Sequence, residues 1–406
     1  MYLNFAWRYF KAKKSANAIN IIAWVTTGVI AFATCCQILV LSVYNGFEDL
    51  VKSLYSSFYT DLKVIPVTGK TFYLDATKIQ LLQQNNYVDK VSFIAEEKAL
   101  LQNGDYQSVV QLKGVDANFK YTCGVASKIT KGAFELGNAV KPTMVVGSGI
   151  QYASGIILNN AYGPEELTII LPKTNVVSND PLASLSEGII TPSGVFSIQQ
   201  DFDNAYAITN IDFVKQQMGM AENEFTAAEI KLKNTSETDV AKIAIEKILG
   251  AKFKVQSRYQ QNSNLYNTMK TEKWAIYAVL TLILIIAAFN MISALTMLVL
   301  EKKQDIAILQ SMGATKTQIK KIFLSEGLLL GSIGTFIGVA IATSICFLQI
   351  KFKIIKLQGG SFLIDYFPVK FLLQDFLLVI FTAMIIVLFA SWLPSQKAAN
   401  QVLELK

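Results

Sequence analysis

The chain has 406 residues, of which 52% are hydrophobic and only 17% are charged. This composition is too apolar for an ordinary soluble enzyme, and the length allows two to three domains. The chain contains no histidine, which excludes Ser-His and Cys-His catalysis and removes the commonest metal ligand.

Four uncharged apolar runs predict membrane-spanning helices, because about 20 helical residues cross the hydrocarbon core of a bilayer. The uncharged runs are residues 19–44, 274–300, 327–350 and 376–393, and the last two are extended to give predicted spans at 324–350 and 373–393. The first run lacks the cleavage site of a signal peptide and is too long for one. We therefore predict a membrane α-helical fold with four transmembrane helices in a 1+3 order. A large α+β extracytoplasmic domain is inserted between the first and second helices.

The segments between these spans complete the predicted domain map. They are an amphipathic helix at 1–18, an extracytoplasmic block at 45–273, a cytoplasmic segment at 301–323, a short outer loop at 351–372 and a tail at 394–406. Residues 1–18 contain Arg8, Lys11, Lys13 and Lys14 and no acidic residue. By the positive-inside rule this end is cytoplasmic, so the large block is expected on the other side of the membrane.

The sequence of the extracytoplasmic block predicts alternating strands and helices. Its pattern in residues 59–116 returns in residues 205–258, and together the two pieces favour one ferredoxin-like subdomain. Asn103-Gly104 separates two extended runs and predicts a hairpin. Residues 117–204 would form an inserted subdomain, whose loop at 174–193 is the expected mobile element.

Two details of this block are also predicted. Asn45-Gly46 is expected to break the first helix at the membrane exit, after which a helix continues to Phe58. Cys123 is the only cysteine of the block, so no disulfide forms inside it.

Two stretches partly match patterns for nucleotide or metal binding, but neither binding site is the favoured interpretation. The stretch "GATKT" at 313–317 resembles the end of a P-loop, but Thr315 stands where glycine must precede the lysine. Asp201 and Asp203 place two carboxylates on one face of a predicted strand. A cation site is one interpretation of this pair, and a solvated turn-edge pair is the favoured one.

The third span carries a stripe of small residues. At about 100° per residue its glycines fall within an arc of roughly 80° and predict close helix packing. They are Gly327, Gly331, Gly334 and Gly338. In the second span, the amide of Asn290 lies inside an apolar run, where a polar group is costly unless it faces another helix or a cavity. Interhelical hydrogen bonding is the favoured interpretation, and substrate contact is the alternative.

The charged segment between the second and third spans has an apolar stripe of its own. Ile306, Leu309 and Met312 recur at spacing three and are expected to share one helix face. Gly313 then fits a helix stop, and Thr315 with Gln318 forms a capping-box pattern for a new helix. The result is a helical elbow whose tip, "SMGA", is shaped to enter a protein groove. A helix lying flat on lipid is the alternative.

Several stretches resemble one family of membrane proteins. "EKKQDIAILQSMGATKTQI" resembles the cytoplasmic segment of FtsX/MacB-type ABC transporter permeases, and "LSVYNGFE" at 41–48 resembles a motif of the LolC/LolE-type lipoprotein-releasing permeases. "WLPSQKAANQVLEL" is similar to their C-terminal ending. The resemblance implies an ATPase-coupling site at Asp305, Ile306, Leu309, Met312, Gly313 and Ala314. It also implies a substrate cavity at Val40, Val43, Tyr44, Phe289, Asn290 and Met291.

The resemblance further implies partners and a place in the cell. An ABC ATPase dimer would bind ATP and Mg, so this chain holds no cofactor and is not itself an enzyme. The other implied partners are a second permease protomer, alike or different, a lipoprotein substrate, a periplasmic carrier and membrane lipid, but no nucleic acid. The implied location is the bacterial inner membrane, with the large domain periplasmic.

The resemblance is compatible with more than one function. An FtsX-like permease that regulates a cell-wall hydrolase and a MacB-like efflux permease are the alternative functions. The sequence leaves open a LolC-like role, a LolE-like role or a homodimer serving both. It also leaves open the substrate and any recruitment of the carrier by residues 174–193.

Overall fold

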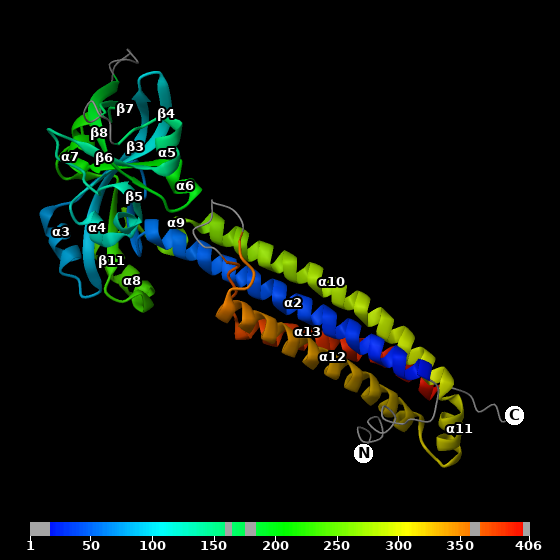
Figure 1. The fold of residues 1–406 in the computed structure, drawn as a ribbon. Helices are drawn as coiled ribbons and strands as arrows, with labels where there is room; N and C mark the ends of the chain where they lie inside the picture. The colour runs from blue at the N-terminus through cyan, green and yellow to red at the C-terminus, as the bar shows by residue number, and fades with distance from the viewer. Residues whose placement is uncertain (1–16, 159–164, 175–183, 358–365, 401–406) are drawn as a thin grey trace. The chain divides into compact units, whose positions relative to one another are not determined.

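The computed structural model describes residues 17–158, 165–174, 184–357 and 366–400. Its contacts divide the chain into two units. The helical unit comprises the described residues up to Leu50 and from Asn267 onward, and the α+β unit comprises Val51–Tyr266 (Figure 1). The predicted helix at 1–18 and the centre of the loop at 174–193 lie outside the described residues.

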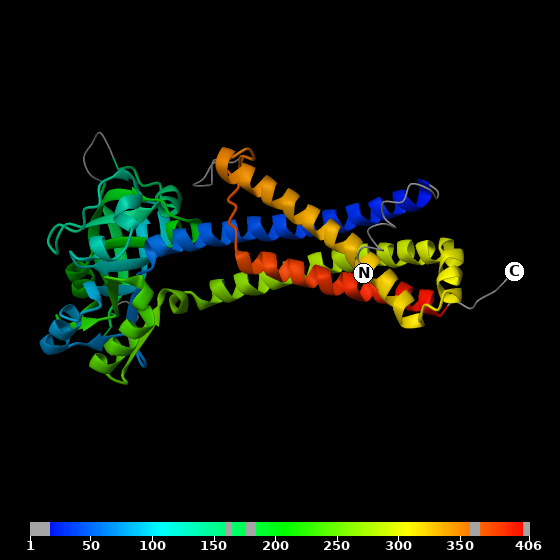
Figure 2. The ribbon, with the colours of Figure 1, turned by 90° about the horizontal axis from the view of Figure 1, so that it is seen from below.

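Four helices of the structure are long and apolar enough to cross a membrane. They are α2 (Asn17–Phe58), α10 (Ser263–Glu301), α12 (Lys316–Phe352) and α13 (Leu373–Ala399). A short helix, α11 (Lys303–Ser311), joins α10 to α12. Within the helical unit the four long helices run beside one another, and α11 turns across the end of α10 (Figure 2).

The predicted break at Asn45-Gly46 is wrong, because α2 runs without interruption to Phe58. A Cβ on Gly46 would lie 2.3 Å from the carbonyl oxygen of Pro368. The glycine therefore permits a close approach of the segment before α13. A glycine in a helical pattern can mark either the end of the helix or a site of close packing. Only the segment that packs against it distinguishes these two cases.

The predicted tail at 394–406 begins as helix. Helix α13 continues through Pro394 and ends at Ala399. Ala398 packs in a buried cluster with Val299 and Ile319, so burial favours continuation of the helix past the proline. Proline is tolerated in such helices when neighbouring groups satisfy the freed backbone carbonyl.

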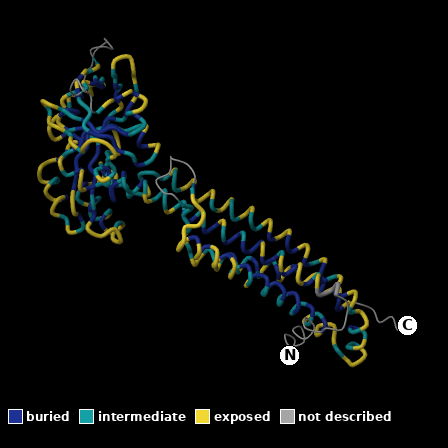
Figure 3. The backbone as a smooth tube through the Cα atoms, viewed as in Figure 1, coloured by how far each residue is buried: buried dark blue, intermediate teal, exposed yellow. Residues whose placement is uncertain are grey.

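Buried residues follow the inward faces of the helices, and exposed residues follow the outward faces (Figure 3). One apolar cluster joins all four long helices. Its buried members are Ala23, Ile30, Ala288, Met291, Leu295, Leu330, Val387 and Ala390. The outward faces are also apolar, which suits a bundle surrounded by lipid.

The α+β unit is organised by one large mixed sheet. At one end of this sheet the strand order is β12-β1-β11-β3, and every pairing is antiparallel. These strands are β1 (Leu62–Pro66), β3 (Val88–Asn103), β11 (Ala227–Leu232) and β12 (Phe253–Ser257). Helix α3 (Ala76–Gln83) connects the first two and α8 (Thr238–Leu249) the last two. This is a β-α-β-β-α-β unit of the ferredoxin-like kind.

The rest of the sheet is an insertion between β3 and β11, which continues the order as β4-β9-β6-β8-β5, with β7 pairing β3 and β8. Its strands are β4 (Tyr106–Val115), β5 (Ile129–Gly132), β6 (Thr143–Gly147), β7 (Leu167–Pro172), β8 (Leu185–Phe196) and β9 (Tyr206–Asn210). The structure therefore moves both predicted boundaries of the insertion, 116/117 and 204/205, because β4 and β9 pair with each other and belong to the insertion. The strands that pair with β9 are distant in the chain, and the alternation of residues within β9 does not indicate which strands they are.

Short elements complete this unit. The helices are α4 (Phe119–Thr122), α5 (Ser148–Ala153), α6 (Gln200–Asp203), α7 (Ile211–Met218) and α9 (Arg258–Gln261). A separate ribbon pairs β2 (Phe72–Tyr73) with β10 (Glu224–Phe225), and two 3-10 turns cover Val125–Lys128 and Thr235–Glu237. The predicted hairpin is confirmed, since Asn103 pairs with Tyr106 and Gly104 adopts φ +56° in the turn.

An ion pair is buried where the last turn of α2 packs into the α+β unit. The Lys113 ammonium lies 2.6 Å from the Glu229 carboxylate, and both side chains are almost fully buried. The rings of Phe58 and Phe119 lie 5.0 and 4.8 Å from the same ammonium. A buried charge needs such partners, because its transfer out of water is costly. The end of α2 is therefore part of the core of this unit.

Candidate functional site

The chain reverses direction at a helical elbow between α10 and α12. Gly313 has φ +91° directly after α11, a conformation that glycine adopts without strain. The Thr315 hydroxyl then accepts a hydrogen bond from the Gln318 backbone N–H over 3.3 Å. The Gln318 side chain accepts one from the Thr315 N–H over 2.8 Å. The predicted stop and capping box are both present, and they define the elbow locally.

The apolar residues of the elbow point to different sides. Ile306 is only 2% exposed and packs against the ends of the bundle helices. Met312 is 79% exposed and Ile308 is 59% exposed. The expectation that Ile306 and Met312 share one helix face is therefore wrong. Helix α11 ends at Ser311, so Met312 no longer follows the helical spacing.

The other predicted coupling residues have mixed environments. Asp305 forms an ion pair with Lys302 at 3.1 Å, and Ala314 packs against the cluster that contains Ile306. Leu309 is half-buried. The exposed large apolar side chains of the elbow are thus Met312, beside the exposed Gly313, and Ile308 on the outward side of α11. Sequence reasoning missed Ile308, whose only signal is that it lies outside the spacing-three stripe.

The glycine stripe of α12 lies against two different helices. A Cβ on Gly327 or Gly331 would come within 2.3 Å of side-chain atoms of Ser391 and Val387 on α13. On Gly334 and Gly338 it would lie 2.8 and 2.4 Å from carbonyl oxygens of α2. All four glycines are buried. The stripe therefore sets the spacing between α12 and both neighbours.

The six predicted cavity residues do not converge within one chain. Met291 is fully buried in the core of the bundle, whereas Phe289 is 63% exposed on α10. Asn290 is exposed beside Phe289, so the described residues do not bury its amide against a second helix. Val40 is exposed on α2 and Val43 is half-buried. The Tyr44 hydroxyl donates a hydrogen bond to the Met269 carbonyl over 2.6 Å.

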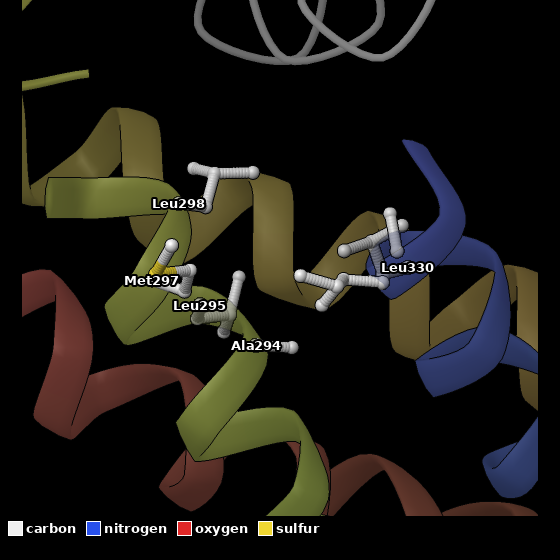
Figure 4. Close-up of a pocket in the computed structure, with 7 residues that line it drawn as sticks. Ala294, Leu295, Met297, Leu298 and Leu330 are labelled. Carbon is white, nitrogen blue, oxygen red and sulfur yellow. The ribbon is translucent and has the colours of Figure 1, made fainter. Parts of the chain in front are cut away.

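A small apolar gap lies near the elbow end of the bundle. Side chains of Ala294, Leu295, Met297, Leu298 and Leu330 surround it, together with Ile22 and Ala23 (Figure 4). Its free volume is about 10 Å³, which is no more than one water molecule needs. This gap is a packing defect and is too small to hold an acyl chain.

The stretch "SVYNGFE" connects α2 to the segment before α13. The Asn45 amide donates a hydrogen bond to Asp375 over 2.6 Å, and Lys273 of α10 contacts the same carboxylate at 2.9 Å. The rings of Phe47 and Phe367 meet edge to face, with centroids 5.8 Å apart. The motif is thus a structural joint between three helices. Lys273 and Asp375 were not singled out in the sequence, although both stand at the start of an apolar run.

Asp201 and Asp203 lie on the one-turn helix α6, so their predicted placement on a strand face is wrong. Asp201 accepts a hydrogen bond from the Tyr55 hydroxyl at 2.5 Å. Asp203 accepts bonds from the hydroxyls of Ser197 and Ser148 and from the Ile198 backbone N–H. The two carboxylates therefore serve separate hydrogen-bond networks.

Comparison with family models shows the likeness of the helical unit to a permease. Residues 277–403 match the family model of the FtsX-like permease C-terminal domain. Over nearly its whole length the chain is similar to LolE of Haemophilus influenzae, a lipoprotein-releasing system transmembrane protein. The two are 24% identical over 97% of this chain and 96% of the relative. LolC of Neisseria meningitidis is 25% identical over 97% of this chain and 95% of its own length. The predicted resemblance to LolC/LolE-type permeases is confirmed.

Among the solved structures that are similar to this chain, two cover about half of it. The periplasmic region of MacB from Actinobacillus actinomycetemcomitans is 12% identical, covers 52% of this chain and 95% of that chain, and gives a TM-score of 0.36. The extracellular domain of the transporter YknZ from Gram-positive bacteria is 10% identical, covers 49% of this chain and 99% of that chain, and gives a TM-score of 0.32.

Proposed function

We propose that this chain is the permease subunit of an ABC transporter that releases lipoproteins from the membrane. The observation that carries this function is the similarity to lipoprotein-releasing system proteins along 97% of the chain, which spans both the helical and the α+β unit. The bundle supplies apolar surface for the lipid chains, and no covalent chemistry in this chain is needed.

A separate ATPase drives the movement through the elbow. Met312 and Ile308 offer exposed apolar side chains, and burial of such a side chain in a protein groove contributes about 1.5–3 kcal/mol. Ile306 anchors α11 to residues of α10, α12 and α13. A displacement of the tip is therefore transmitted to three helices of the bundle. ATP and Mg are held by the ATPase.

The substrate cavity is formed with a second permease protomer. In one chain Val40 and Phe289 are exposed on α2 and α10, and both are apolar. A facing protomer, alike or different, would enclose these surfaces. The exposed Asn290 amide is costly in lipid, and a partner helix or the substrate would satisfy it. Met291 has no part in the cavity, because it is buried in the protomer core.

The protein lies in the inner membrane in a 1+3 arrangement, with the α+β unit in the periplasm, where a carrier receives the lipoprotein. The orientation is tested with single cysteines at Ser236 and Thr317, which are both exposed. An impermeant maleimide applied to spheroplasts should label position 236 and not position 317. Labelling of position 317 in intact spheroplasts would reverse the orientation. Ser178, at the centre of loop 174–193, lies outside the described residues.

The function is tested by reconstitution of the chain with its ATPase and a labelled lipoprotein in liposomes. We expect ATP-dependent appearance of the lipoprotein in the soluble fraction when the carrier is added. A permease that only signals to a cell-wall hydrolase would hydrolyse ATP and leave the lipoprotein in the membrane, and that result would contradict the proposal.

A further inference from the structure

A pocket of the helical unit lies at the end of the bundle where α13 begins. It has a volume of about 330 Å³, which is at the lower end of the range for ligand pockets. Three helices contribute its lining residues, which are Leu41, Lys273, Trp274, Tyr277, Gln374, Asp375 and Leu378. This site is separate from the elbow and from the exposed faces assigned to the lipoprotein cavity.

The lining has an apolar part and a charged part. Leu41, Trp274 and Leu378 supply hydrocarbon and ring surface. Lys273 and Asp375 stand at the start of two apolar helical runs, where a membrane-spanning helix meets the aqueous boundary. Trp274 is 56% exposed at the same level, as is typical of a tryptophan among lipid headgroups.

The charged part presents two opposite charges side by side. The Lys273 ammonium lies 2.9 Å from Oδ2 of Asp375, and the two side chains keep 25% and 13% of their surface exposed. Asn45 donates to the same Oδ2 atom. Asn45 and Lys273 thus both donate to Oδ2 of Asp375. Among the described residues no other side chain donates to this carboxylate, so its Oδ1 atom can accept a hydrogen bond from a ligand. The pair thus offers an ammonium to an anion and a carboxylate oxygen to a cation.

We propose that this pocket binds one zwitterionic glycerophospholipid of the surrounding membrane. Its phosphate contacts Lys273, its primary ammonium contacts Oδ1 of Asp375, and part of one acyl chain lies along Leu41 and Leu378. A headgroup with a phosphate and an ammonium matches the pair in sign, and each contact is a charge-assisted hydrogen bond. The lipid fills the space between α10 and α13 and supports the joint made by Asn45 and Asp375.

Other lipids fit this chemistry less well. A diacylglycerol has neither charge and leaves the ion pair without new partners. Phosphatidylglycerol has the phosphate but no ammonium, so it satisfies Lys273 and offers Asp375 only neutral hydroxyl donors, whose hydrogen bonds are weaker than that of an ammonium. The inference does not depend on the transported cargo, because binding requires neither ATP nor lipoprotein.

The test is native mass spectrometry of the full-length chain, purified and delipidated in detergent and then titrated with single lipids. The probes are phosphatidylethanolamine, phosphatidylglycerol and diacylglycerol with identical acyl chains. We expect one phosphatidylethanolamine per chain, bound at least about tenfold more tightly than either of the other lipids, since one charge-assisted hydrogen bond contributes about that factor. Equal binding of the three lipids overturns the proposal.

Two matched pairs of variants locate the site. Lys273→Gln should weaken phosphatidylethanolamine binding about tenfold, whereas Lys270→Gln, at an exposed lysine three residues earlier, should not. Leu378→Trp should block the pocket, whereas Leu377→Trp, at a neighbouring residue that is 58% exposed, should not. Leu378→Trp leaves the ion pair intact. If Lys273→Gln fails to fold, lipid binding by Leu378→Trp therefore still tests the location of the site. Undiminished binding by Leu378→Trp overturns the proposal.

Discussion

The side-chain amide of Asn45 donates a hydrogen bond to the carboxylate of Asp375 across 2.6 Å, although 330 residues separate them in the chain. Asn45 is almost fully buried, and its neighbour Gly46 lies directly against the backbone of Pro368. The motif that carries the family resemblance is therefore a packing joint. It holds the first long helix to the last one, beside a pocket that contains Lys273.

Gly46→Ala should destabilise this joint. The new methyl group would lie 2.3 Å from the Pro368 carbonyl oxygen, and overpacking of this kind costs about 1–3 kcal/mol. We expect a lower melting temperature of the purified protein in detergent. Gly28→Ala is the matched control on the same helix, because nothing lies within 4 Å of its Cβ position. If both variants melt alike, the close approach at Gly46 has no energetic role.

Gly334→Leu should separate α12 from α2. Even the Cβ atom would lie 2.8 Å from the Thr27 carbonyl oxygen, and the rest of the leucine has no room. We expect a lower melting temperature and reduced transport. Ala340→Leu, on the exposed side of the same helix, should leave both unchanged. Full stability of Gly334→Leu would contradict the packing role of the stripe.

Met312→Asp should weaken association with the ATPase at least about tenfold. The substitution removes an exposed apolar side chain from the tip of the elbow and places a charge where a groove would desolvate it. The quantity to measure is recovery of the ATPase in a pull-down from detergent. Lys303→Asp serves as a control for a change of charge at the start of α11. Undiminished recovery with Met312→Asp would remove the assignment of the elbow to coupling.

Ile306 and Ile308 are the same residue type and lie two positions apart. We expect Ile306 to stabilise the fold and Ile308 to contact the ATPase. Ile306→Ala removes a buried side chain and should lower the free energy of unfolding by about 2–5 kcal/mol. Ile308→Ala should leave stability unchanged and reduce ATPase recovery, because this side chain is 59% exposed. Thermal melting and the pull-down together separate the two effects. A reversed result would mean that α11 is rotated in the working complex.

Cys123 should be resistant to alkylation. Burial of the thiol raises the pKa of Cys123 from 9.0 to about 12, and only the thiolate is nucleophilic. At pH 8 the thiolate fraction of Cys123 is therefore lower than that of a solvent-exposed thiol. Mass spectrometry of tryptic peptides after iodoacetamide treatment measures the rate, with Ser127→Cys as an exposed reference in the same unit. Equal rates at the two positions would refute the burial argument.

The same shift predicts a dependence of stability on pH. The unfolded chain loses the Cys123 proton near pH 9, whereas the folded chain keeps it to about pH 12. Stability from this group is therefore fully present below pH 9 and is lost as pH rises across that window. Cys123→Ser should show a flatter decline of melting temperature above pH 9 than the unchanged protein.

Short-range patterns in the sequence predicted the elements that depend on a few neighbouring residues. The length of the apolar runs indicated four membrane helices. Gly313 and the Thr315–Gln318 pair ended one helix and began the next. The turn at Gly104 joined two strands. Each of these features is decided by local geometry or by transfer of one segment out of water, so the residues involved are close in the chain.

Tertiary structure decided everything that depends on a distant partner. The sequence around Gly46 predicts a helix break, but in the structure this glycine packs against Pro368 inside a continuous helix. The spacing of Ile306 predicts a place in the apolar stripe of the elbow, but the ends of three helices bury this side chain. Strand β9 joins the insertion because β4 and β6 hydrogen-bond to it. The pairing of Asp375 with Asn45 and Lys273 has no local signal at all. Packing and hydrogen bonding select partners by proximity in space, and spacing along the chain does not record that proximity.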